Sequence, residues 1–404
     1  WGIDRMKSMI RERADWCISR QRRWGLPIPV FYCKDCGKPI CTDETIDAIS
    51  KLFAAEGSNA WFAKEAEEIL PEGFACPHCG AKAGFTKETD TLDGWFDSGS
   101  SHFAAMKKDQ GFWPATMYLE GLDQYRGWFQ SSLLTAVGAF GEGAPFKECV
   151  THGWTVDGEG RAMHKSLGNG VDPADIFKAI FQQLSQNYLK FRNTCKFMLD
   201  NLVDFDPAHL TKAEDMPVLD RWLITKLNEL IEKVEQSYND YEFHIITHAV
   251  NDFCVTTLSS FYLDIVKDRL YCEAADSAER RSAQTALYLT LSTLAKLFAP
   301  ILAFTCDEIW LAMPHTAEDD ARNVVLNDMN KPFTAYALDA ETMARWEHII
   351  EVRTAVNGAL EEARAAKVIG KSLEADVHLT VPEGDVFLAD ENPAALADLF
   401  IVSK

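Results

Sequence analysis

The chain has 404 residues, 47% of them hydrophobic and 25% charged, which is enough apolar material for two or three packed domains. No run of eighteen or more apolar residues occurs, so the sequence predicts no membrane-spanning segment. The formal net charge of -21 excludes a protein that holds nucleic acid by a general basic field. The 11 cysteines are scattered except for two pairs, which favours a reducing cytoplasm and one metal site over a disulfide framework.

Residues 1–30 predict an amphipathic helix and then a proline-rich extended segment that leads into a strand. The chain starts at Trp1, within what reads as structured sequence, which suggests a fragment of a longer protein. The basic residues of this region are Arg5, Lys7, Arg11, Arg13, Arg20, Arg22 and Arg23. A local nucleic-acid contact and an ordinary solvated helix face both fit this pattern.

Two Cys-x-x-Cys-Gly motifs come next, and their cysteines are Cys33, Cys36, Cys76 and Cys79. The glycine lets backbone amides turn toward the thiolates, and two such knuckles complete a tetrahedral Zn²⁺ site. The long spacing between the motifs predicts a small folded insertion over about residues 31–86. A redox pair is the alternative for either motif. His78 is predicted to be a bystander, and Cys41 is the less favoured substitute ligand.

Two further segments combine strand residues with Gly, Asp and Trp. Residues 85–103, FTKETDTLDGWFDSGSSHF, by themselves predict a polar turn with Trp95 in the core. Residues 117–140 predict a strand, a Gly-Asp turn and a helix whose amino terminus offers free amides to an anionic ligand. Trp128 is by default a core residue of that helix. The polar side chains expected where the strand ends are Glu120, Asp123 and Gln124.

Residues 148–173, ECVTHGWTVDGEGRAMHKSLGNGVDP, predict a buried strand around Cys149–Thr151, a glycine-rich turn and a basic loop. Lys165 would lie beyond the carboxyl end of a strand, where α/β folds bind ligands, and could meet phosphate there. An ordinary solvated turn that contains a lysine is the alternative.

The remainder of the chain reads as helical. Apolar residues recur at helical spacing over 182–205, over 217–271 in two or three helices, and in a later pair broken at Pro300. This pattern predicts an all-helical bundle, in which His244 and His248 belong to the core or to helix packing rather than to a ligand site. From about 342, a helix is expected to lead into an alternating strand, Ala375 to Val381.

Several of these strings resemble class I aminoacyl-tRNA synthetases, the isoleucyl-tRNA synthetases in particular. They are WCISRQRRWGLPIPVFYC, TDTLDGWFDSGSS, GLDQYRGWFQSSL and, for the Lys-Met-Ser-Lys-Ser loop of the class, DGEGRAMHKSLGN. The strings RNTCKFML and FAPILAFTCDEIW resemble the anticodon-binding bundle of the same enzymes. The resemblance implies an α/β domain followed by an all-α domain.

The implied domains are three. Residues 1–181 would be the C-terminal half of a Rossmann-like nucleotide-binding fold, with the zinc-knuckle insertion and a signature loop at 157–169. Residues 182–340 would be the anticodon-binding bundle, and residues 341–404 the start of a C-terminal junction domain.

The resemblance also implies the activity, which is ligation of isoleucine to tRNA-Ile with ATP and Mg²⁺, by a cytoplasmic monomer with a structural Zn²⁺. Lys165 and Ser166 would be catalytic, and Trp95 and Trp128 would line the amino-acid pocket. The residues implied to hold ATP or the adenylate are Glu120, Gly121, Asp123, Gln124, His152, Gly153, Met163 and Lys165.

The chain departs from the family pattern in three ways. The His-x-Gly-His half of the catalytic fold and the editing domain are not in the sequence. A helix and loop that the family carries are missing between Lys178 and Phe181. Ala162 and His164 stand where the signature loop has its first Lys and first Ser. A non-catalytic tRNA-binding paralogue and a zinc-stabilised scaffold therefore remain the alternative functions.

Overall fold

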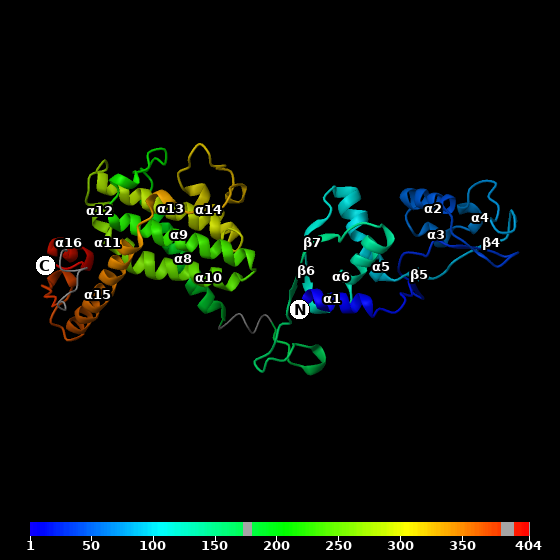
Figure 1. Ribbon diagram of the computed structural model, residues 1–404, viewed down its shortest axis with the longest axis horizontal. Helices are drawn as coiled ribbons and strands as arrows, with labels where there is room; N and C mark the ends of the chain where they lie inside the picture. Colours follow the sequence, from blue (N-terminus) through cyan, green and yellow to red (C-terminus); the bar gives the residue numbers. More distant parts are fainter. Residues whose placement is uncertain (173–179, 381–391, 404) are drawn as a thin grey trace. The chain divides into compact units, whose positions relative to one another are not determined.

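The computed structural model describes residues 1–172, 180–380 and 392–403, and its backbone forms two compact units, residues 1–170 and residues 171–404 (Figure 1). The sequence suggests that a helix and loop of the family are missing between Lys178 and Phe181. This position lies partly outside the described residues, so the suggestion stays a prediction. Among the described residues, no helix is both long enough and apolar enough to cross a membrane.

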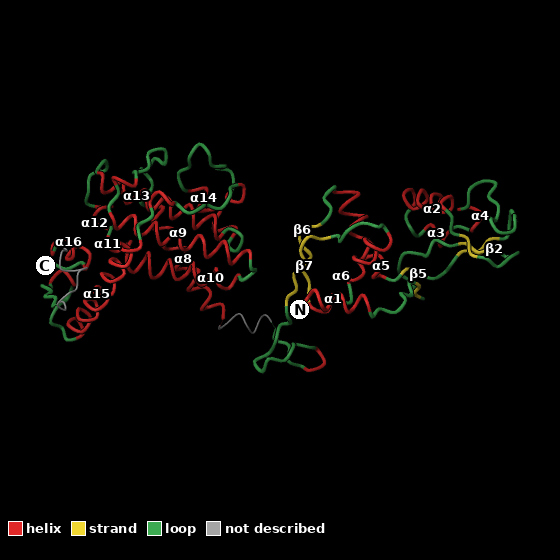
Figure 2. The backbone as a smooth tube through the Cα atoms, in the orientation of Figure 1, coloured by secondary structure: helices red, strands yellow, loops and turns green. Residues whose placement is uncertain are grey.

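The cysteine-bearing part of the first unit is a small subdomain. Its strands β2, β3 and β4 span Phe31–Cys33, Pro39–Ile40 and Phe85–Lys87, and the yellow strand segments near β2 in Figure 2 mark this sheet. The sheet is antiparallel and has the order β3-β2-β4. The helices α2, α3 and α4 fill the segment between the two motifs and span Asp43–Glu56, Ala60–Ala63 and Ala66–Ile69. The apolar core of this subdomain includes Phe31, Ile40, Ile49, Trp61 and Phe85. The residues between the two motifs thus fold into a compact segment, which brings the second motif next to the first.

The centre of the first unit is a pair of parallel strands. In this pair β6 (Ala115–Gly121) lies beside β7 (Phe146–His152), in register from Ala115 opposite Phe146 to Gly121 opposite His152. The predicted burial of Cys149–Thr151 is wrong, because these residues are only half-buried. Among the described residues this sheet has two strands, too few to be enclosed on both faces as larger parallel sheets are.

Helices cover this strand pair. The helix α1 (Gly2–Arg11) confirms the predicted first helix. Following it, β1 (Ser19–Arg20) pairs with β5 (Thr91–Leu92), and α5 (Gly94–Ser101) then packs against α6 (Trp128–Leu133). The predicted turn over residues 85–103 is therefore wrong for its second half. Asp93 caps α5 by accepting from Trp95 N, and the Trp95 ring is 45% exposed rather than in a core.

The second unit is the all-helical bundle that the apolar periodicity predicts. Its described helices include α8 (Ile180–Asp200), α9 (Val218–Asn239), α10 (Phe243–Asp252), α11 (Leu263–Ile265) and α12 (Lys267–Tyr271). The chain then forms α13 (Ala278–Phe298) and α14 (Ala303–Ala312), so the predicted break at Pro300 is confirmed. Most of α13 is buried, which makes it the centre of the bundle.

Three expectations for the second unit need correction. The helix predicted to reach residue 205 ends at Asp200. His244 and His248 are exposed on α10, because Ile246 and Val250 take its buried face. Residues 375–380 form no strand, and Val381 lies outside the described residues. Ala375 and Val377 instead pack against an apolar cluster formed by α15 (Ala340–Ala365) and α16 (Pro393–Phe400).

One buried carboxylate of α9 binds side chains from three other elements of the bundle. Asp220 of α9 is fully buried and accepts hydrogen bonds from Tyr262 Oη at 2.7 Å and Ser282 Oγ at 2.5 Å. It also receives both Nη atoms of Arg269, at 2.9 and 2.6 Å. Every donor around the carboxylate is thus supplied by another element of the bundle, so removing Asp220 would leave the partly buried Arg269 guanidinium without its carboxylate partner.

We expect Asp220→Ala to lower the free energy of unfolding of the bundle by about 3–5 kcal/mol, because it leaves the Arg269 guanidinium without its carboxylate partner. Asp200→Ala is the control, since it breaks only the exposed pair with Lys196 and should leave stability unchanged. Equal midpoints for both variants in urea unfolding, followed by far-UV circular dichroism, would contradict the role of Asp220.

Candidate active site and metal centre

The ends of the two parallel strands bring predicted site residues together. Gly121 ends β6 and His152 ends β7, in register with each other. A Cβ atom at Gly121 would lie 2.8 Å from Asp123 Oδ1 and 3.6 Å from His152 Cε1, so both side chains lie close to the backbone at the end of β6. His152 is exposed, and its Nδ1 lies 2.8 Å from the Gly153 carbonyl oxygen, to which it donates. The His152 Nε2 atom is then the ring's acceptor.

A cavity of about 470 Å³ opens beside these strand ends. Its lining residues are Trp95, Ser98, Ser101, Glu120, Gln124 and Trp128. Four of them were predicted from the sequence, and the two serines were not. The signal for the serines was available, because Trp95, Ser98 and Ser101 recur every three residues and so share one face of α5.

The aromatic wall of this cavity is held from several sides. The Trp128 ring stacks on Tyr118 at 4.0 Å between centroids, and its Nε1 donates to the Ser98 carbonyl at 3.1 Å. The backbone N–H of Trp128 donates to Gln124 Oε1 at 3.0 Å. A Cβ atom at Gly127 would lie 2.9 Å from Trp95 Cη2, so the Trp95 ring rests directly on the backbone there. The result is an aromatic slot with a carboxylate and an amide at its edge.

The two helices that carry these tryptophans meet at backbone contact. A Cβ atom at Gly99 of α5 would lie 2.8 Å from both backbone C and O of Ser131 in α6. Nearby, Thr135 Oγ1 donates to the Gly99 carbonyl at 2.7 Å and lies 3.1 Å from Nε2 of the buried His102. Trp113 Nε1 donates to His102 Nδ1 at 3.2 Å, which requires the neutral ring, and burial lowers the pKa of His102 in the same sense. These contacts set the separation between Trp95 and Trp128.

The basic loop is organised by two side chains that the sequence did not single out. Asp157 accepts from the backbone N–H groups of Glu159 at 3.0 Å and Arg161 at 2.9 Å, and from Asn169 Nδ2 at 2.8 Å. Donation by Asn169 and Arg161 lowers the pKa of Asp157 to about 2. Asn169 Oδ1 in turn accepts from His164 N at 2.9 Å. The loop is thereby closed on itself, and it exposes Lys165.

The remaining predicted loop residues lie on this frame. Met163 N donates to the Thr155 carbonyl at 2.9 Å and its side chain is half-buried. Lys165 and Ser166 form the short 3₁₀ turn Lys165–Leu167, for which His164 is the cap. Because Lys165 is exposed at the start of this turn, its ammonium group is available to an anion outside the loop.

Of the seven basic residues near the start of the chain, two are engaged within the first unit. Arg13 Nη1 donates to Gln130 Oε1 at 2.5 Å, and Arg20 Nη2 donates to Asp93 Oδ2 at 2.7 Å. The other five are exposed: Arg5, Lys7, Arg11, Arg22 and Arg23. The predicted basic patch is therefore smaller than its sequence suggests.

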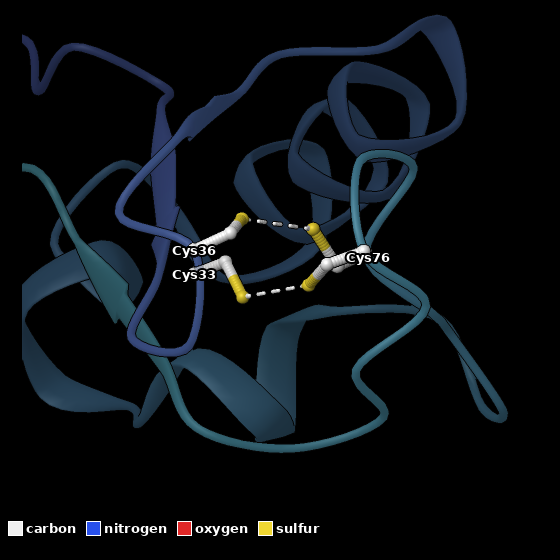
Figure 3. Close-up of side chains that lie close together, drawn as sticks. Cys33, Cys36 and Cys76 are labelled. Carbon is white, nitrogen blue, oxygen red and sulfur yellow. Dashed lines mark hydrogen bonds between the residues drawn. The ribbon is translucent and has the colours of Figure 1, made fainter.

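The four cysteines of the two knuckles converge at one point (Figure 3). The sulfur atoms of Cys33 and Cys79 are 3.7 Å apart, those of Cys36 and Cys76 are 3.8 Å apart, and all four lie within 4.8 Å of one another. Tetrahedral thiolates about 2.3 Å from a Zn²⁺ ion would be about 3.8 Å apart. A disulfide needs sulfurs about 2.05 Å apart. The short distances join the two motifs, which argues against a redox pair within either one.

The backbone of each knuckle turns as the motif predicts. Gly37 and Gly80 have φ of 69° and 78°, and their N–H groups donate to the carbonyls of Cys33 and Cys76, both at 2.8 Å. His78 Nε2 donates to the Pro39 carbonyl at 3.1 Å instead of joining the sulfurs. Cys41 is likewise outside the cluster that the described residues form. The four cysteines are therefore positioned to hold a metal ion.

Comparison with known proteins gives the class. Residues 1–246 match the family of class I tRNA synthetases (I, L, M and V), and residues 220–379 match the anticodon-binding domain of tRNA ligases. The LeuRS of Agrobacterium radiobacter K84, solved in a ternary complex with tRNA and LeuAMS, has the same fold. It aligns with 80% of this chain and 43% of its own at a TM-score of 0.51 and 20% identity. The chain belongs to the class I tRNA synthetase family.

Two curated relatives of the chain share one name within this class. The isoleucine–tRNA ligases of Moorella thermoacetica and Desulforamulus reducens are 48% and 49% identical to this chain over its whole length. The chain spans about half the length of these relatives, 46% in each case. The Moorella alignment extends over 436 positions against 404 residues here, so that relative carries at least 32 residues within the matched region that this chain lacks.

We expect Gly99→Ala to lower the free energy of unfolding of the first unit by about 1–3 kcal/mol, because the new methyl group forces α5 away from α6. Gly138→Ala is the control, since nothing lies within 4 Å of a Cβ atom there. Urea unfolding followed by near-UV circular dichroism measures both. Identical midpoints for Gly99→Ala and the unaltered chain would contradict the close contact at Gly99.

Proposed function

We propose that this chain is part of an isoleucine–tRNA ligase, which activates isoleucine with ATP and transfers it to tRNA-Ile. The observation that carries the proposal is the cavity in which Trp95, Trp128, Glu120 and Gln124 converge beside the carboxyl end of β6. Open α/β sheets bind ligands at this end of their strands. The names of the curated relatives support isoleucine as the amino acid.

In this proposal the cavity holds the amino acid. The Trp95 and Trp128 rings would pack against the aliphatic side chain of isoleucine, and the Glu120 carboxylate would bind its ammonium group. Gln124, whose Oε1 is held by Trp128 N, would fix the orientation of the same end. Gly121 and Gly153 would let the nucleotide approach the strand ends closely, with Asp123 and His152 beside it.

The reaction needs no protein nucleophile. The isoleucine carboxylate attacks the α-phosphate of ATP, the bond to pyrophosphate breaks, and the enzyme contributes position and charge. Lys165 would stabilise the charge that develops on pyrophosphate, with Ser166 and Met163 shaping the loop around it. Mg²⁺, which accompanies ATP, would neutralise part of the same charge.

The second unit would bind the tRNA. Its match to the anticodon-binding domain over residues 220–379 supports this role. The exposed basic residues near the start of the first unit would add a local contact, since the net charge of -21 leaves no general basic field. We propose that the protein acts as a monomer in the cytoplasm. A tRNA-binding paralogue without activity is the second candidate, favoured by Ala162, His164 and the 32 or more residues missing against the Moorella relative.

The metal of the cysteine cluster would be Zn²⁺ with a structural role. The sulfur separations of 3.7 and 3.8 Å and the all-thiolate donor set support this ion over the hard cations, which prefer oxygen. The ion would join the two ends of the insertion and supply folding free energy rather than chemistry.

We expect Cys36→Ser to lose the zinc that the unaltered chain retains through dialysis, about one ion per chain, because one of four ligands is gone. Cys41→Ser should retain the full amount, since that sulfur lies outside the cluster. Elemental analysis of the purified proteins measures the zinc content of each. Equal zinc contents in Cys36→Ser and the unaltered chain would overturn the proposed metal site.

We expect Lys165→Ala to slow isoleucine-dependent exchange of labelled pyrophosphate into ATP by about 10²–10³-fold, as removal of a charge-stabilising donor does. The exchange is measured on this chain and on a form extended to the length of the curated relatives. Lys147→Ala, an exposed lysine of β7, serves as the control. Exchange in no form of the unaltered protein would move the assignment to the tRNA-binding paralogue.

A further inference from the structure

The basic loop carries three exposed side chains that are cationic or can become so: Arg161, His164 and Lys165. They differ in the contacts that their nitrogen atoms already make within the loop. Arg161 is paired inside the loop. Its Nε lies 2.9 Å from Asp157 Oδ2, and its Nη1 lies 3.1 Å from Glu159 Oε2. Two carboxylates therefore neutralise the Arg161 guanidinium before any outside anion arrives.

His164 is held in one orientation by the residue two positions later. Its Nδ1 accepts from Ser166 N at 3.3 Å and lies 2.7 Å from Ser166 Oγ. A backbone N–H can only donate, so Nδ1 is an acceptor and the hydrogen of the neutral ring is on Nε2. No contact with another described residue occupies that Nε2–H. His164 is exposed, and Nε2 is the ring nitrogen that takes no part in the cap.

Lys165 is the next residue, and its ammonium forms no ion pair with a carboxylate of the described residues. The loop thus presents two neighbouring donors to the outside, Lys165 Nζ and His164 Nε2. One is a mobile point charge and the other a fixed N–H. A group with several oxygens on adjacent phosphorus atoms can accept from both at once.

We propose that His164 donates from Nε2 to a phosphate oxygen of the pyrophosphate portion of the nucleotide, beside Lys165. Ser166 is the positioning residue, because its hydroxyl and its backbone N–H hold the ring. This inference rests on the proposed function, in which the loop meets ATP. It assigns a ligand contact to a histidine that departs from the signature of the family, and it leaves Arg161 as part of the frame.

The test uses His164→Asn, because asparagine is also a good helix cap and keeps an acceptor for Ser166 N but lacks the outward ring nitrogen. We expect pyrophosphate affinity, measured by calorimetric titration, to fall about tenfold, the effect of losing one hydrogen bond to a charged group. The KM for pyrophosphate in exchange should rise equally, while the KM for isoleucine stays within about twofold. Lys147→Ala, which removes an exposed lysine outside the loop, is the control and should change neither value.

A double-mutant cycle separates the two roles. Ser166→Ala should cause a similar loss, and His164→Asn combined with Ser166→Ala should be no worse than either variant alone, since both remove the same contact. Additive losses would overturn the positioning role of Ser166. Unchanged pyrophosphate affinity in His164→Asn, with affinity lost in Lys165→Ala, would overturn the inference and leave the proposed function standing. If the unaltered protein neither binds pyrophosphate nor exchanges it, both are wrong.

Discussion

The parallel pairing of β6 with β7 is the constraint on which the site depends. Six residue pairs, from Ala115 with Phe146 to Gly121 with His152, put two strand ends at one edge. The segment after β6 then supplies Asp123 and Gln124, and the segment after β7 supplies Gly153 and the basic loop. A slip of one residue in this register would turn Glu120 away from the cavity that it now lines, because successive side chains of a strand point to opposite faces.

The cavity beside that edge depends on a second constraint, the close contact of α5 with α6. Gly99 allows the two backbones to touch, and His102 and Thr135, in the segments that follow the two helices, are joined by a hydrogen bond. Trp95 and Trp128 are carried by these two helices, so their separation is a property of the helix contact rather than of either ring. The cysteine cluster contributes no lining residue to this cavity, and it brings together the two ends of the segment that precedes α5.

The sequence predicted what depends on spacing and on specific strings. The four cysteines, the strand and helix around Glu120 and Trp128, and the helical bundle were all placed from such patterns. It did not predict that Asp157 and Asn169 organise the basic loop, because their hydrogen bonds span up to 12 residues and depend on a turn geometry that no periodicity encodes. It placed His244 and His248 wrongly, since an amphipathic helix has two faces and only the contacts of Ile246 and Val250 decide which is buried. It also expected a strand over 375–380, where alternation is present but no partner strand pairs with it among the described residues.

The central claim is that the edge formed by β6, the aromatic cavity and the basic loop make one ligand site. Hydrogen exchange of backbone amides, measured with and without a non-hydrolysable isoleucyl-adenylate analogue plus pyrophosphate, tests this directly. The account predicts slower exchange in residues 117–128 and 161–167 together, with α13 of the bundle unchanged. Slower exchange in only one of the two segments, or in neither, would show that they do not serve a common ligand.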